Sequence, residues 1–279
     1  GRWFETANPY TGEAWAQIAR ADATDVELAV AAAHRAFREG AWPALSPSQR
    51  GRLVRRFGEV LEKHAAELAT IEARDNGKLY AETFNQARYL CEWFQFYGGL
   101  ADKIEGSVPA MDKPDVLHYT RHEPLGVCAC ITPWNSPLLL LAWKAAPALA
   151  AGNTLVIKPS EFTSASTLEF ARLSLEAGLP PGVVNVVTGF GAEVGEPLVR
   201  HPKVRKIAFT GGEAGGRSVN IAAAADFKRV TLELGGKSAN IVFDDANLDQ
   251  AVSGAISGIF AASGQTCIAG SRLLLQDSI

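Results

Sequence analysis

The sequence predicts an α/β fold in which a parallel β-sheet is covered by helices on both faces. From Gly126 onward, short runs rich in β-branched residues alternate with stretches of helical periodicity. The runs are apolar throughout, which is typical of parallel strands that are buried on both faces. Gly, Pro and Asn gather directly after several of these runs. Because parallel sheets bind ligands at the carboxyl ends of their strands, we expect a nucleotide site at this edge.

Five runs are the strand candidates of this sheet: Val127–Ile131, Thr154–Lys158, Val183–Val187, Lys206–Thr210 and Arg229–Leu234. Helices are expected to begin between them near Ser136, Thr163, Ala192 and Ala214. A later helix, from about Leu248 to Ser263, precedes Gly264–Cys267 and a strand-like run at Leu273–Leu275. Because no helix or polar tail follows that run, we interpret the sequence as a piece of a longer protein.

The first third of the chain is predicted to be helical. Thr24–Glu27 matches a capping box, and Ser46–Gln49 matches a second helix start with proline at the first helical position. A third helix is expected from about Ala81 to Tyr97. Residues 106–123 break the helical pattern with two prolines. They predict a surface ribbon that includes the strand-like run Val116–Thr120.

The composition is that of a packed globular protein. Of 279 residues, 47% are hydrophobic and 20% are charged, which excludes an intrinsically disordered chain. Lys and Arg number 27 against 30 Asp and Glu, for a net charge of -3. Since no basic stripe stands out, a nucleic-acid partner is not expected. The longest apolar stretch, Leu138–Ala151, contains a lysine and a proline and is too short for a bilayer, so no membrane partner is expected.

One of the four cysteines differs from the other three in its sequence surroundings. The four show neither metal-site spacing nor disulfide density, so we expect no metal. With a start that lacks a secretory signal, they predict a cytoplasmic protein. Cys91, Cys128 and Cys130 occupy apolar helix or strand positions and are assigned to packing. Cys267 follows the polar, glycine-rich Gly264–Thr266, which favours an accessible thiol, although a buried cysteine is the commoner case.

Glycine-rich segments follow two of the expected strands. Gly211–Gly216 lies between a strand and a helix, so its amides could face a phosphate, but it lacks G-x-G-x-x-G spacing. Gly189–Gly191 comes close to that pattern, and its next glycine, Gly195, is one residue late. By themselves, both segments fit structural turns as well as phosphate contacts.

Lys158 and Glu161 lie at the end of one strand and the start of the next helix. They fit an ordinary strand-end charge and a glutamate favoured by the helix dipole. Alternatively, both hold ribose hydroxyls at the sheet edge. A carboxylate there accepts from a 2′-hydroxyl and repels a 2′-phosphate, which favours NAD over NADP. The two residues alone favour the ordinary interpretation.

Two further polar residues occupy unusual positions. Asn135 lies between two prolines and either caps a helix, for which Ser136 is also suited, or donates its amide to a developing oxyanion. Glu233 lies in an apolar run that ends in two glycines. A carboxylate buried there is suited to act as a general base, and we favour this role over a plain ion pair with Lys237. No histidine shows ligand spacing.

Five segments occur in an order that is typical of one enzyme family. They are Thr132–Asn135 (TPWN), Lys158–Glu161 (KPSE), Phe209–Gly212 (FTGG), Leu232–Lys237 (LELGGK) and Gly264–Cys267 (GQTC). Together they resemble the NAD(P)-dependent aldehyde dehydrogenase superfamily. The resemblance covers essentially the whole chain, which corresponds to roughly the first half or more of a family member. It implies a Rossmann-like cofactor domain and the oxidation of an aldehyde to a carboxylic acid.

The resemblance implies three catalytic residues. Cys267 would attack the aldehyde to give a thiohemiacetal, which becomes a thioester when hydride leaves for the nicotinamide. Asn135 and the backbone amide of Cys267 would stabilise the oxyanion. Glu233 would activate the water that hydrolyses the thioester.

The resemblance also implies the residues that bind the cofactor. Lys158 and Glu161 would hold the adenosine ribose, and Gly211–Gly216, which has the family's G-x-x-x-x-G spacing, would pass close to the pyrophosphate. The implied set is Thr132, Pro133, Trp134, Lys158, Ser160, Glu161, Gly191, Phe209, Thr210, Gly211, Gly212, Gly216, Leu234 and Gly235. Gly212 departs from the family, where serine often contacts the phosphate. NAD is the expected cofactor, with NADP possible.

The implied domain organisation has three parts. Residues 1–105 and 124–235 would bind the cofactor, 106–123 would form a bridging and oligomerisation arm, and 236–279 would begin a second, catalytic α/β domain. The full-length protein would be a homodimer or homotetramer. Two alternatives remain: a semialdehyde dehydrogenase that passes the thioester to coenzyme A, which Glu233 disfavours, and a nucleotide-binding fragment without catalysis.

Overall fold

The computed structural model describes all residues, 1–279. The chain begins with an antiparallel hairpin of β1 (Arg2–Ala7) and β2 (Ala14–Arg20). The expectation of a helical first third is therefore wrong at its start. The turn between the strands contains Asn8, Pro9 and Gly12, and Gly12 has φ 72°. These are strong turn formers between two short runs, so a signal for the hairpin was present.

Five helices follow the hairpin: α1 (Ala23–Arg38), α2 (Ala41–Ala44), α3 (Pro47–Lys63), α4 (Ala65–Asn76) and α5 (Tyr80–Leu100). The capping box of α1 uses Asp22 and Asp25 instead of the predicted Thr24–Glu27, because the helix begins at Ala23, two residues earlier than predicted. The predicted box of α3, Ser46 with Gln49, is confirmed. α4 ends at Gly77, whose φ of 72° satisfies the left-handed cap.

All five strands predicted for the parallel sheet form. They are β3 (Val127–Ile131), β4 (Thr154–Lys158), β5 (Val184–Val186), β6 (Val204–Thr210) and β7 (Arg229–Glu233), in the order β5-β4-β3-β6-β7. The chain therefore leaves β3 towards one edge of the sheet and returns to its other side at β6. Such a switch point opens a crevice at the carboxyl ends of the two strands.

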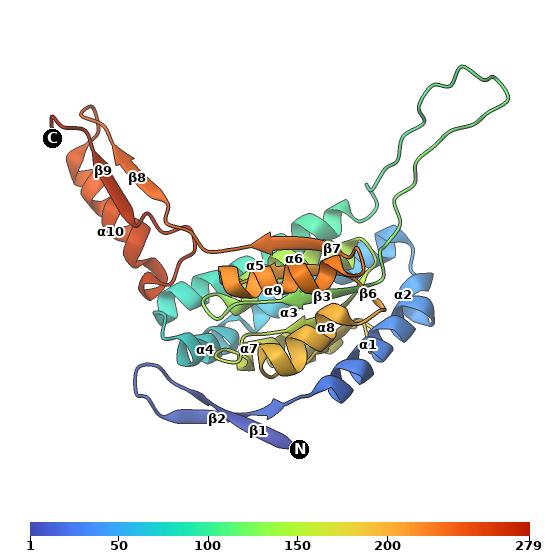
Figure 1. Cartoon of the computed structure of the whole chain (residues 1–279), viewed down its shortest axis with the longest axis horizontal. Coiled ribbons are helices and arrows are strands. Elements are labelled where there is room, and N and C mark those ends of the chain that lie inside the picture. Colours follow the sequence, from blue (N-terminus) through green and yellow to red (C-terminus); the bar gives the residue numbers. More distant parts are fainter.

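Helices cover both faces of this sheet (Figure 1), as predicted. Between the strands lie α6 (Pro137–Ala150), α7 (Ala165–Glu176), α8 (Glu196–Arg200) and α9 (Glu213–Ala224). The helix expected near Ala192 is instead a π-helix, η1 (Gly191–Gly195), that runs directly into α8.

The side chains of the central strand β3 point alternately into two hydrophobic cores. Cys128 and Cys130 of β3 point into the larger core, which α3, α4, α5, α6 and α7 complete. Val127, Ala129 and Ile131 of the same strand point into the smaller core with α1, α8 and α9. Each side chain of β3 is thus buried against one helical layer or the other, which explains why the strand is apolar throughout.

Two segments project from opposite ends of this body (Figure 1). Residues 101–126 form a long arm, and β8 (Ala239–Val242), α10 (Leu248–Gly264) and β9 (Arg272–Leu275) form a smaller unit whose two strands pair in parallel. The strand-like Val116–Thr120 forms no strand, since no other strand lies beside the arm to pair with it. β8 was not predicted. The non-helical residues 261–263 interrupt α10 close to the predicted end of that helix.

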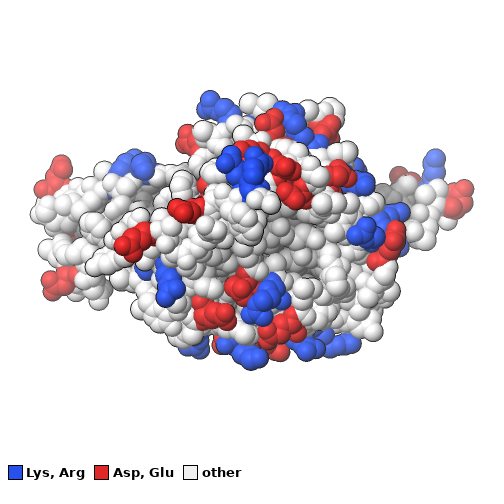
Figure 2. Space-filling model, turned by 90° about the horizontal axis from the view of Figure 1, so that it is seen from below, with Lys and Arg blue, Asp and Glu red and all other residues white.

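No helix in the chain combines the length and the apolar character that a membrane span requires. On the face shown in Figure 2, Lys and Arg side chains are interspersed with Asp and Glu.

A buried carboxyl group ties the hairpin to the main body. Asp75, at the end of α4, accepts hydrogen bonds from Thr6 Oγ1 in β1 at 2.8 Å and from the Ala165 amide of α7 at 3.1 Å. Burial raises the pKa of Asp75 from 3.8 to about 6, against those hydrogen bonds. The folded state therefore holds this proton more tightly than the unfolded state. The resulting stability is complete below the unfolded pKa and is lost as the pH rises through about 6.

Asp75→Asn is expected to flatten this pH dependence. Between about pH 4 and pH 7, the wild-type free energy of unfolding should fall by about 2 to 3 kcal/mol relative to the variant, because the neutral amide carries no buried charge. Urea unfolding followed by tryptophan fluorescence at several pH values measures this difference. The exposed Asp115→Asn is the matched control. Parallel curves for wild type and Asp75→Asn would contradict the assignment.

Candidate active site

A cavity of about 680 Å³ lies at the switch point of the sheet, where β3 and β6 end. Ten of the predicted cofactor residues line it: Thr132, Pro133, Trp134, Lys158, Ser160, Glu161, Gly191, Phe209, Thr210 and Gly211. They come from the carboxyl ends of neighbouring strands, from the loops that follow these strands and from η1. Its volume lies in the range of small-molecule and cofactor sites. Gly215, from the predicted segment Gly211–Gly216, also lines it. Further walls that were not predicted come from Phe162, Glu196, Arg200 and the α9 residues Ser218, Val219, Ile221 and Ala222.

Lys158 and Glu161 form an ion pair inside this cavity. Lys158 Nζ lies 3.2 Å from Glu161 Oε2, and the Lys158 side chain is 6% exposed. Burial lowers the pKa of Lys158 below its usual range, while the attraction of Glu161 opposes the shift. The ordinary ion pair considered from the sequence is therefore present, and it lines the cavity as well.

A buried hydroxyl in the same cavity lacks a partner. Thr132 directly follows β3 and is 3% exposed, and its Oγ1 makes no hydrogen bond within the chain. Buried polar atoms are normally paired, so an orphaned one in a residue that lines a cavity marks a place where a polar ligand can bind.

The glycine segment after β6 packs around an aromatic ring. A Cβ at Gly211 or Gly215 would come within 2.6 or 3.0 Å of Phe209 Cζ, so only glycine lets the backbone pass this close to the ring. Gly212 is the N-cap of α9, and Gly215, in the first turn of that helix, lines the cavity. Gly216 has a packing role, since a Cβ there would meet Leu234 Cδ2 at 2.6 Å. Gly212 and Gly216 do not line either cavity described here.

A second cavity of about 270 Å³ adjoins the first. Both are lined by Pro133, Trp134, Thr210 and Gly211, so the two cavities share a wall. The second holds Asn135 and Cys267, which are 132 positions apart in the sequence, and its lining includes the predicted Leu234 and Gly235. The structure thus brings two of the three predicted catalytic residues together beside the predicted cofactor site.

Cys267 differs from the other thiols in its surroundings. It is partly exposed, whereas Cys91, Cys128 and Cys130 are buried. Burial raises the pKa of Cys91 and Cys128 to about 11 and that of Cys130 to about 12. These three thiols are therefore poor nucleophiles near neutral pH, which agrees with their assignment to packing.

Asn135 contacts the segment that carries Cys267. Its Nδ2 donates to the carbonyl oxygen of Gln265 at 2.6 Å, and because an amide nitrogen carries two hydrogens, a second remains for another acceptor. The neighbouring Ser136 occupies the N-cap of α6, as predicted, but its hydroxyl makes no cap bond and instead accepts from Lys78 Nζ at 3.2 Å.

The surroundings of Glu233 differ from those expected from the sequence. It was expected in a buried apolar environment, but its side chain is exposed, because β7 is an edge strand of the sheet. Neither Glu233 nor Lys237 takes part in an ion pair. Glu233 does not line either cavity described here, although Leu234–Lys237 line the smaller one. No three His, Cys, Asp or Glu side chains lie close enough together to hold a metal ion.

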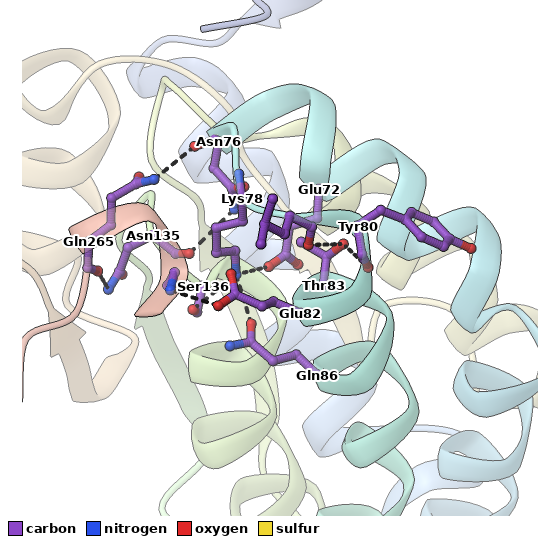
Figure 3. A network of polar contacts seen from close by, with 12 residues as sticks. Glu72, Asn76, Lys78, Tyr80, Glu82, Thr83, Gln86, Asn135, Ser136 and Gln265 are labelled. Carbon is purple, nitrogen blue, oxygen red and sulfur yellow. Dashed lines mark hydrogen bonds and ion pairs between the residues drawn. The ribbon is translucent and has the colours of Figure 1, made fainter. Parts of the chain in front are cut away.

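The turn between α4 and α5 supplies a polar network that sequence reasoning missed (Figure 3). Lys78 is fully buried there and pairs with Glu72 at 2.9 Å. Asn76 links the Asn135 loop to the Cys267 loop. A lysine after Asn76–Gly77 looks like an ordinary surface residue of a turn, so the sequence offered little signal for its burial.

The sequence matches the aldehyde dehydrogenase family over residues 1–279. A (Z)-2-((N-methylformamido)methylene)-5-hydroxybutyrolactone dehydrogenase of Acinetobacter baylyi is 50% identical over 99% of this chain and 57% of that protein. Human retinal dehydrogenase 2 is 46% identical over 100% of this chain and 54% of its own length. The crystal structure of PnpE from Pseudomonas sp. WBC-3 in complex with nicotinamide adenine dinucleotide superposes with a TM-score of 0.96 at 48% identity, covering 100% of this chain and 57% of that one.

The chain belongs to the aldehyde dehydrogenase family. The predicted family and the predicted α/β fold are thereby confirmed. The chain spans about half the length of the curated relatives it matches.

Proposed function

We propose that the protein oxidises an aldehyde to a carboxylic acid with NAD. The observation that carries this proposal is the shared wall of the two cavities: a partly exposed thiol and an amide donor lie directly beside a site suited to a dinucleotide. The family and its NAD-bound member PnpE support the same activity.

The residues present fit NAD. Thr132 offers an unpaired hydroxyl, the Lys158–Glu161 pair offers a donor and an acceptor for ribose hydroxyls, and the amides of α9 suit a pyrophosphate. When bound, NAD supplies the hydride acceptor that turns a thiohemiacetal into a thioester. Glu161 favours NAD, since its carboxylate would repel a 2′-phosphate.

Three side chains have separate roles in the proposed reaction. Cys267 Sγ attacks the carbonyl carbon, and the oxygen of the resulting thiohemiacetal accepts hydrogen bonds from Asn135 Nδ2 and from the Cys267 amide. After oxidation, Glu233, whose neighbour Leu234 lines the smaller cavity although Glu233 itself does not, takes a proton from the water that attacks the thioester, which releases the acid and restores the thiolate. This hydrolytic route separates the proposal from transfer to coenzyme A.

We also infer the domain organisation, the oligomeric state and the cellular location of the protein. We assign 1–105 and 124–235 to the cofactor domain, 106–123 to a bridging arm and 236–279 to the beginning of the catalytic domain. An arm with exposed Val108, Leu117 and Tyr119 supports a homodimer or homotetramer of the whole protein. Four free thiols support a cytoplasmic location.

Aldehyde-dependent NADH formation by the purified protein tests the proposal. A panel of aliphatic, aromatic and semialdehyde substrates should include at least one that raises NADH absorbance. Iodoacetamide should abolish the rate in proportion to the alkylation of Cys267, with the three buried thiols unmodified. Binding of NAD without turnover of any aldehyde would oppose it and favour a nucleotide-binding role.

Glu161→Gln is expected to relax the preference for NAD. Loss of the carboxylate removes the repulsion of a 2′-phosphate, so kcat/KM for NADP relative to NAD should rise by about tenfold. Glu196→Gln is the matched control, because it removes a different carboxylate from the same cavity. An equal change in both variants would show that net charge, and not the position of Glu161, sets the preference.

A further inference from the structure

The turn Asn76–Lys78 contacts both loops of the proposed active site. Asn76 Nδ2 donates to the carbonyl oxygen of Asn135 at 3.3 Å, and the Asn76 carbonyl accepts from Gln265 Nε2 at 3.1 Å. Asn135 and Gln265 also bind each other at 2.6 Å. The three residues therefore form a closed triangle in which Asn76 holds the other two (Figure 3).

Lys78 holds the loop that carries Asn135, one of the three residues of this triangle. Its side chain is fully buried, and its ammonium group donates to Glu72 at 2.9 Å, to Gln86 at 2.7 Å and to Ser136 at 3.2 Å. An ammonium group has three hydrogens, so all of its donors are satisfied. Because Ser136 directly follows Asn135, the position of Lys78 constrains the loop that presents the amide.

The same turn holds the loop that precedes Cys267. Ser263 Oγ donates to the Gly77 carbonyl at 3.2 Å, and the Ala262 amide donates to Glu82 in α5 at 3.1 Å. Ala262 and Ser263 have φ values of 54° and 57°, a left-handed conformation that is unfavourable for residues other than glycine. These hydrogen bonds therefore help to hold the loop in a conformation that it would not adopt alone.

We propose that Asn76 and Lys78 are positioning residues that set the placement of the Asn135 amide relative to the Cys267 thiol. The proposal rests on the proposed function for its catalytic meaning, since it concerns the oxyanion donor and the nucleophile. Neither residue touches the reacting atoms. Asn76 acts through the two loops that it joins, and Lys78 acts through the Asn135 loop alone. A small displacement of either loop would separate donor and nucleophile.

Asn76→Ala tests the proposal, with Asn185→Ala as its matched control. Each variant removes an asparagine side chain that makes two hydrogen bonds, and Asn185 bonds to Leu155 and Gly182 at the edge strand β5. We expect Asn76→Ala to lower kcat by about 10- to 100-fold while KM for NAD stays within about twofold, because the larger cavity is untouched. Alkylation of Cys267 by iodoacetamide should become faster by about threefold or more, because the loop is released. Asn185→Ala should change neither quantity.

Each outcome of this experiment decides the proposal. Equal effects of the two variants, or a rise in KM for NAD without a fall in kcat, would overturn it. If the unaltered protein forms no NADH, the proposed function fails, and alkylation alone then decides whether Asn76 places Cys267. Should Asn76→Ala not fold, Ser136→Ala takes its place, with Ser174→Ala, a buried serine bonded within α7, as control.

Discussion

Replacing Cys267 by alanine is expected to lower aldehyde-dependent NADH formation by on the order of 10⁴-fold or more, because no other group of the site can form the covalent intermediate. The thiol does not line the larger cavity, so binding of NAD should be unchanged. Initial rates of NADH formation, together with quenching of tryptophan fluorescence by NAD, measure the two properties separately.

Cys91→Ala is the matched control for this prediction. It removes a sulfur atom that is buried in α5 and packed away from both cavities. Its activity should stay within about twofold of wild type, and its melting temperature should fall because a buried side chain is shortened. Retention of more than about a tenth of the wild-type rate by Cys267→Ala would exclude Cys267 as the nucleophile.

Glu233→Gln is expected to stop the reaction after its first half. The variant should release about one equivalent of NADH per active site and then turn over about 10²- to 10³-fold more slowly than wild type, since the water that attacks the thioester lacks its base. Rapid mixing resolves the burst. The mass of the peptide that contains Cys267 should show the acyl group.

Hydroxylamine provides a second test of the same step. It attacks a thioester without a general base, so when it is added after the burst, with excess aldehyde removed to avoid oxime formation, it should release the acyl group from Cys267 of Glu233→Gln as a hydroxamate. The freed variant should then give a second burst of NADH with fresh aldehyde. Glu5→Gln removes another exposed glutamate from a strand, and it should behave as wild type. A variant that loses the burst as well would show that Glu233 acts before the thioester forms.

The parallel sheet was predictable because each of its strands has a local signature. Val127–Ile131 is apolar at every position, since both of its faces meet helices, and the other runs share this pattern to different degrees. The hairpin at the N-terminus was missed although its turn residues are evident. Helical periodicity in the following segments outweighed two short strands that pair only with each other.

The site was predictable where its residues follow strands directly. Asn135 comes a few residues after β3, and Cys267 lies in a glycine-rich segment, so chemistry and position both mark them. The exposure of Glu233 was not predictable, because it depends on what lies beside an edge strand and not on the residues around it in sequence. The burial of Lys78 likewise depends on Ser136, which is distant in sequence, and on Gln86, which lies in the following helix α5.

The four residues that line both cavities have a consequence for changing the enzyme's specificity. Pro133, Trp134, Thr210 and Gly211 face the proposed dinucleotide site and the proposed aldehyde site at once. A substitution at any of them alters two binding equilibria together, so selection for a new aldehyde at these positions is tied to retention of the dinucleotide. Thr266 and Lys237 line the smaller cavity alone. Variation that broadens or narrows the range of aldehydes should therefore accumulate at such unshared positions, with the common wall held constant.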